Sequence, residues 1–216
     1  MMRKARILGF AALLLASGLI PSMATSVVPM NIVDLVQRAS RVFEGRCTAI
    51  AHETVQTQDG TEMPIVRYTF DVVDGLYGVS TKQISISHLG KFQDGRRFFA
   101  DPDFLGVPKY QMGQSYILFV NHDSGTTGLS VPIGFQQGVF FVQGELAVSG
   151  SDEEQLMKGL DQALTGTNYQ SLLPQEQKTL KATVFERGMD KNTFKALVRD
   201  LIAGNIKAPS LAEVQQ

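Results

Sequence analysis

The stretch that decides the fold is Phe43-Glu44-Gly45-Arg46-Cys47-Thr48-Ala49. Its odd positions are small or apolar, and its even positions are polar. Because successive side chains of a strand point to opposite faces, this alternation predicts a half-buried strand over about residues 41–52, with Cys47, Ala49 and Ala51 on the inward face. Cys47 is the one cysteine of the chain, so no internal disulfide forms, and we expect a structural, buried thiol.

Further elements are expected on both sides of this strand. Asn31 is expected to cap a short helix that ends near Ser40. A second alternating strand, over about residues 65–73, is expected to form a long hairpin with the first. The remaining expected strands are 83–87, 116–120, 139–142 and 145–148. Of these, 116–120 and 139–142 are apolar at both odd and even positions, which predicts strands that are covered on both faces.

The apolar periodicity becomes that of helices after Gly150. Ser151 begins a capping-box pattern, and apolar residues at helical spacing follow it as far as Gly166. A helix over residues 180–185 is also expected, and Asp190 is expected to cap a further one. The apolar stripe of that last helix consists of Phe194, Leu197, Val198, Leu201 and Ile202.

Together these elements predict an α+β fold. We expect a small, mostly antiparallel, OB-like β-barrel or curled sheet followed by C-terminal helices, because exposed strand edges need protection and each helix has an apolar stripe to bury. The expected division of the chain is a signal peptide at 1–24, a β-barrel domain at 25–150, a helical part packed on the barrel at 151–204 and a tail at 205–216.

The N-terminus has the pattern of a cleaved secretory signal. Three basic residues lie within the first six positions, residues 7–20 are apolar, and the small residues Ser22 and Ala24 precede the expected cleavage site. The apolar run is shorter than the ~20 residues that span a bilayer. We therefore expect an exported chain, in the periplasm or outside the cell, with no stable membrane insertion after cleavage.

The composition excludes several classes of protein. The chain has 20 Lys+Arg and 21 Asp+Glu, and removal of residues 1–24 takes away three basic groups and no acidic group, which leaves a formal charge of −4. Such a chain has no broad electrostatic attraction for nucleic acid. Its hydrophobic fraction of 44% is too high for a disordered protein.

Several segments resemble a widespread group of uncharacterised exported bacterial proteins. The segments are 33–48, 68–78, 110–119 and 132–140. More remotely, the strand pattern is similar to netrin-like modules, the OB-type barrels that include the tissue inhibitors of metalloproteinases. Those inhibitors use an N-terminal cysteine and several disulfides, whereas this chain has Cys47 alone. The resemblance therefore implies barrel geometry without the inhibitor mechanism.

No catalytic motif is complete in the sequence. It lacks the G-x-S-x-G elbow, the P-loop, C-x-x-C and the dinucleotide fingerprint, so we expect no catalytic residue, no metal and no cofactor. The alternative is a zinc site made by His52, His88 and His122, each near the end of an expected strand. In a simple meander His122 lies at the opposite end from the other two, although the long connection over residues 90–113 could reverse that geometry.

This connection over residues 90–113 is longer than the usual loop inside a compact domain, and such loops are commonly functional. Arg96, Arg97 and Phe99 are the expected binding residues, because arginine and aromatic side chains dominate the energetics of interfaces. The alternative is a local plug that packs the loop over the barrel. This plug would consist of Phe98, Phe99 and Phe104.

Two function classes follow from these features. We expect an exported, soluble, non-enzymatic binding or interaction module whose partner is an unknown protein or small-molecule ligand. The alternative is a hydrolase or metal-dependent enzyme whose site is assembled from loops. Histidine or carboxylate side chains that converge in a cleft would favour the enzyme.

Export is expected to remove residues 1–24, because the charged, apolar and small-residue segments stand in the order that signal peptidase requires. The intact mass of the exported protein, measured by mass spectrometry, should correspond to a chain that begins at Thr25. A mass that retains residues 7–20 would contradict the assignment.

Overall fold

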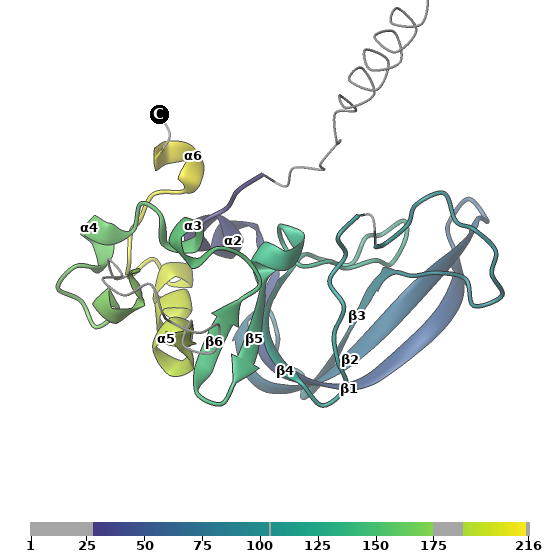
Figure 1. The fold of residues 1–216 in the computed structure, drawn as a ribbon, viewed down its shortest axis with the longest axis horizontal. Coiled ribbons are helices and arrows are strands. Elements are labelled where there is room, and N and C mark those ends of the chain that lie inside the picture. The colour runs from purple at the N-terminus through teal and green to yellow at the C-terminus, as the bar shows by residue number, and fades with distance from the viewer. Residues whose placement is uncertain (1–27, 104, 175–187, 215–216) are drawn as a thin grey trace, which may run out of the picture.

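The fold was obtained as a computed structural model, which describes residues 28–103, 105–174 and 188–214. In these residues an antiparallel sheet of seven strands has the order β3-β2-β1-β4-β5-β6-β7. Figure 1 shows the helices gathered at one end of the sheet and the long, curved strands β1 and β2 extending to the other. The α+β class with mostly C-terminal helices is confirmed.

The bounds of the elements agree closely with the alternating and helical segments of the sequence. The strands are β1 (Arg41–Gln56), β2 (Glu62–Tyr77), β3 (Gln83–Leu89), β4 (Ser115–Val120), β5 (Val139–Gln143), β6 (Leu146–Ser149) and β7 (Met189–Asp190). The helices are α2 (Ile32–Arg38), α3 (Glu153–Met157), α4 (Asp161–Leu164), α5 (Lys191–Ile202) and α6 (Leu211–Val214). Two 3-10 turns lie at Phe135–Gly138 and Gln170–Leu172.

The sheet is not closed into a barrel, so the OB-like barrel is not observed and the sheet keeps two edges, β3 and β7. One irregular segment covers part of the β3 edge. The Ser130 amide donates to the Ser87 carbonyl at 2.8 Å, and the Ser130 hydroxyl accepts from the Ser87 amide at 3.2 Å. Two residues further on, Pro132 bridges to Val120 at the end of β4. Backbone groups of the edge are thereby satisfied without another strand.

Two apolar cores lie on opposite faces of the sheet. One face packs against α2 and α5 and contains Phe119, Phe140 and Phe194. The other contains Phe43, Phe70 and Cys47, among others. All of Tyr116–Val120 is buried, which confirms the prediction of a strand covered on both faces. Cys47 is fully buried as predicted, and burial raises the pKa of its thiol.

The C-terminal helices differ from their prediction in number and in one cap, and the short helix α6 lies in the expected tail. Asp190 caps α5 by accepting from the Thr193 amide at 2.8 Å, as expected. The segment after Ser151 forms two short helices instead of one, because Gly159 has a φ of +83°, a left-handed conformation that ends α3. The cap of α3 is Asp152. The helix expected at 180–185 lies outside the described residues.

A buried ionic cluster attaches α5 to the sheet. Glu44 of β1 and Asp74 of β2 are direct cross-strand partners, an arrangement of like charges that is destabilising by itself. Lys195 of α5 reaches both carboxylates, with Nζ 2.6 Å from Glu44 and 3.0 Å from Asp74. Arg199 also pairs with Asp74 at 2.5 Å. Burial acts to raise the pKa of Asp74, but hydrogen bonds from Lys195 and Arg199 outweigh it and lower the pKa.

Lys195→Met is expected to lower the free energy of unfolding by about 3 kcal/mol, because it leaves the buried Glu44 carboxylate with Lys191 at 3.5 Å in place of Lys195 at 2.6 Å. The double variant Glu44→Gln/Lys195→Met should lose less than the single one, since no unpaired charge is then buried at this position. Urea unfolding of both variants measures the difference. A double variant that is less stable than Lys195→Met would contradict this account of the cluster.

Candidate functional site

The candidate site arises where β1 and β2 continue beyond β4. β1 and β2 each have 16 residues, but β4 has 6 and pairs with Arg41–Arg46 alone. The end of the 90–113 connection continues this edge for one residue, because the Gly113 amide donates to the Cys47 carbonyl and the Cys47 amide donates to the Gln114 carbonyl. Beyond Cys47, strands β1, β2 and β3 continue as a three-stranded ribbon. The inner face of this ribbon must be covered by another part of the chain.

A β-bulge determines which side chains of β1 face this space. The register with β2 shifts between Cys47 and Ala49, so that Ile50 pairs with Tyr68 and His52 pairs with Val66. Because one residue is inserted, the side chains of β1 after the bulge point to the face opposite to the one that strict alternation predicts. The prediction that Ala49 and Ala51 continue the inward face is therefore wrong: both are exposed, whereas Ile50 and His52 line the space on the ribbon's inner side.

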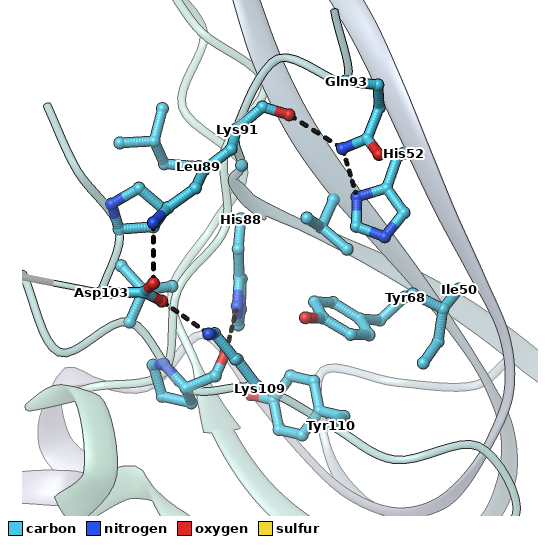
Figure 2. Close-up of a pocket in the computed structure, with 15 residues that line it drawn as sticks. Ile50, His52, Tyr68, His88, Leu89, Lys91, Gln93, Asp103, Lys109 and Tyr110 are labelled. Carbon is cyan, nitrogen blue, oxygen red and sulfur yellow. Dashed lines mark hydrogen bonds and ion pairs between the residues drawn. The ribbon is translucent and has the colours of Figure 1, made fainter. Parts of the chain in front are cut away.

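The space between the ribbon and the 90–113 connection is a pocket of about 390 Å³. Figure 2 shows Ile50 and His52 of β1, Tyr68 of β2 and His88 of β3 on one side and the loop residues Lys109 and Tyr110 on the other. Its apolar walls come from residues of the strands and of the loop. These wall residues are Ile50, Val66, Leu89, Pro102, Val107 and Pro108.

Three rings form the most buried part of the lining. The Tyr68 ring lies 5.3 Å from that of His88 and 4.9 Å from that of Tyr110, centroid to centroid, in edge-to-face geometry. Tyr110 also contacts the rings of Phe70 and Tyr116. Tyr110 therefore anchors the connection to the concave core. Of the alternative plug, Phe99 is 91% exposed, Phe98 contacts the rings of Phe92 and Phe99, and Phe104 lies outside the described residues.

His88 is held in one tautomer by its surroundings. Its side chain is buried, and Nδ1 lies 3.0 Å from the Pro108 carbonyl oxygen. A carbonyl only accepts hydrogen bonds, so Nδ1 carries the proton and Nε2 is an acceptor. Burial lowers the pKa of His88 to about 4, which the Pro108 bond opposes only in part. Nε2 has no hydrogen-bond partner among the described residues.

Tyr110 presents a second buried polar atom without a partner. Its hydroxyl makes no hydrogen bond within the described part of the chain. Burial raises the pKa of Tyr110 well above its ordinary value, so the hydroxyl stays protonated. Since buried polar groups in native proteins are almost always hydrogen-bonded, two such atoms on adjacent rings mark this end of the pocket as unusual.

The mouth of the pocket carries balanced charges. Lys91 pairs with Asp101 at 3.1 Å and with Asp103 at 2.8 Å, and Lys109 pairs with Asp103 at 2.5 Å. Hydrogen bonds from Lys109 and Lys91 lower the pKa of Asp103 to about 2. Two cations and two anions thus neutralise one another at the entrance. Neither lysine is available as a single unpaired positive charge.

The three residues expected to bind a partner lie on the exposed half of the connection. Arg96 pairs with Asp94 at 2.7 Å and with Glu62 at 2.5 Å, and its guanidinium lies 4.3 Å from the Phe92 ring centroid. Arg97 is exposed, and Phe99 contacts the Phe98 ring while 91% of it faces solvent. None of the three lines the pocket. Their role in binding stays a prediction.

The three histidines lie at two ends of the sheet, as was expected for a simple meander. His52 and His88 both line the pocket, whereas His122 follows β4 at the end of the sheet where β1 begins. Within the ranges that the structure describes, no group of three His, Cys, Asp or Glu side chains could hold a metal ion. The sequence contained one sign of the pocket that was missed: Ile84, Ile86 and His88 share a parity in β3, which places His88 on the apolar face.

His88 makes the stability of the fold depend on pH. Its pKa is 6.5 ordinarily and about 4 when folded, so the unfolded chain binds the proton first as pH falls. From pH 7 to pH 4.5 this linkage should remove about 2 kcal/mol of stability. His88→Phe should reduce the loss measured by denaturant unfolding at the two pH values, and His122→Phe, at an exposed site, should not. Equal pH dependence in all three proteins would contradict a buried, neutral His88.

No protein-family model and no curated protein matches this chain. The resemblance to exported bacterial proteins and to netrin-like modules therefore stays a prediction. The helices that the structure describes include none with the length and apolar character to cross a membrane.

Proposed function

We propose that this chain is an exported, non-enzymatic binding module that takes a small ligand in the pocket between the β1–β2–β3 ribbon and the 90–113 connection. The observation that carries the proposal is the cavity of about 390 Å³. Small-molecule sites have volumes of roughly 300–1,000 Å³, mostly apolar walls and a few convergent polar groups. The pocket has a volume in this range and mostly apolar walls, and polar groups come from His52, Tyr68, His88, Gln93 and Tyr110, with Lys91, Asp103 and Lys109 at its mouth.

The arrangement of the sheet supports the same function. The curled ribbon and the segment that joins β3 to β4 through Ser130 and Pro132 are compatible with a distant likeness to partly open OB-type barrels. Proteins with such barrels commonly bind ligands on a concave strand face and its flanking loops. Export, in this proposal, rests on the N-terminal sequence alone, and the ligand would be met in the periplasm or outside the cell.

The enzyme alternative has less support than the binding module. The carboxylates nearest the pocket, Asp101 and Asp103, are held by Lys91 and Lys109. His52 is exposed and lies 3.4 Å from the Gln93 amide, and His88 is bonded to a backbone carbonyl. No acid–base pair or nucleophile–base pair is formed by these side chains, and such a pair is the usual geometric sign of hydrolytic catalysis.

A pocket-blocking variant tests the proposal. Ile50 lies at the edge of the pocket and is 37% exposed, so Ile50→Trp should fill the entrance without disturbing the core. Val73→Trp is the matched control, because Val73 is also exposed on a strand but does not line the pocket. Saturation-transfer NMR with small aromatic and aliphatic fragments should identify binders. Ile50→Trp should weaken their binding about tenfold or more, equivalent to 1.4 kcal/mol.

Both variants should keep the melting temperature of the parent protein, since neither replaces a buried side chain. Fragments that bind Ile50→Trp as tightly as the parent would show that the pocket is not the binding site. The absence of any fragment binding to the parent protein would count equally against the proposal.

A further inference from the structure

The two unpartnered polar atoms of the pocket lining define the chemistry of its buried end. His88 Nε2 and the Tyr110 hydroxyl are both shielded from solvent and lack hydrogen bonds within the described residues. Their rings lie 5.4 Å apart, centroid to centroid, and both residues line the pocket. The two rings are therefore close enough for one ligand to contact both.

The hydrogen-bonding roles of the two atoms differ. Nε2 of His88 can only accept, because the proton is on Nδ1 and is donated to the Pro108 carbonyl. The Tyr110 hydroxyl is protonated, so it can donate, and its oxygen can also accept. A ligand group that uses both the His88 acceptor and the Tyr110 proton gives one N–H or O–H to His88 and offers one lone pair to Tyr110.

Charge on that ligand group is unfavourable here. The surroundings of the two atoms are the rings of Tyr68, Tyr116 and Phe70, and a charge buried among them would lack a counter-ion. The nearest cations, Lys91 and Lys109, are already paired with Asp101 and Asp103 at the mouth. The pocket therefore offers hydrogen bonds to a neutral group and no field that would attract an ion.

We propose that the buried end of the pocket recognises an uncharged group that both donates and accepts hydrogen bonds, such as an alcohol or a primary amide, carried on an apolar or aromatic body. This inference rests on the proposed ligand-binding function and specifies the ligand class. The donor of the ligand binds His88 Nε2, its acceptor binds the Tyr110 hydroxyl, and its body lies against the apolar walls.

The ligand reaches these atoms by a small displacement of the lining. Both atoms are shielded from solvent, and segment 107–110, which contains Tyr110, is attached to β3 by the bond from His88 to Pro108. Side-chain adjustments of this kind are common on binding. The adjustment is favourable because it ends with both buried atoms hydrogen-bonded, whereas each is unsatisfied without ligand.

Matched probes test the ligand class. Benzyl alcohol and benzamide carry the uncharged donor and acceptor, toluene carries neither, and benzoate and benzylammonium carry charge. Dissociation constants from NMR titration should be about tenfold lower for benzyl alcohol and benzamide than for the other three, because buried polar groups of a site reject analogues that leave them unpaired.

Two tyrosine variants test whether the Tyr110 hydroxyl recognises the ligand or stabilises the fold. Tyr110→Phe removes a hydroxyl that has no partner, so it should keep or raise the melting temperature while the preference for benzamide over toluene is lost. Tyr116→Phe is the control: that hydroxyl accepts from the Gln111 amide at 2.8 Å, so its removal should lower the melting temperature and leave the preference intact.

The outcomes distinguish this inference from the proposed function. Equal binding of all five probes, abolished by Ile50→Trp, would keep the pocket and overturn the ligand class. Preferred binding of benzoate would do the same, and so would a Tyr110→Phe variant that is destabilised as much as Tyr116→Phe or that retains the preference. If no probe binds the parent protein, both the function and the ligand class are wrong.

Discussion

The mismatch in length between β1 and its neighbour β4 is the constraint on which the rest of the structure depends. β1 has 16 residues, but β4 has six, so beyond Cys47 β4 does not continue the sheet beside β1. The inner face of the β1–β2–β3 ribbon is therefore open at the β1 edge. Apolar residues on that face must still be shielded from water. The 90–113 connection does this through Pro108 and Tyr110, and an irregular cover of this kind leaves a pocket that a paired strand would have filled.

The two ends of the molecule use polar groups differently. At the helical end, Lys195 lies between two like charges, Glu44 and Asp74, and pairs with both. At the pocket, His88 and Tyr110 each bury a polar atom that lacks one in the described chain. We assign the proposed ligand to these two atoms because buried polar groups in native proteins are almost always hydrogen-bonded.

Sequence patterns predicted most elements because strand alternation, helix caps and apolar stripes are local. The Asn31 cap, the hairpin, the two-sided burial of β4 and the Asp190 cap are all observed. The pocket could not be predicted in this way. It depends on a bulge after Cys47, which no local pattern marks, and on the long-range approach of Tyr110 to Tyr68 and His88. An OB-like barrel or a curled sheet was predicted; the sheet is not closed into a barrel, and an irregular segment covers part of its β3 edge.

The side-chain nitrogens of His88 give the most direct test of this account, and nitrogen NMR of the imidazole measures both. At neutral pH, Nδ1 should be protonated and Nε2 should not, and the ring should titrate near pH 4. Benzamide should shift the Nε2 signal much more than the Nδ1 signal. A ring that carries its proton on Nε2, or one that titrates near its ordinary pKa of 6.5, would contradict a buried acceptor at the end of the pocket.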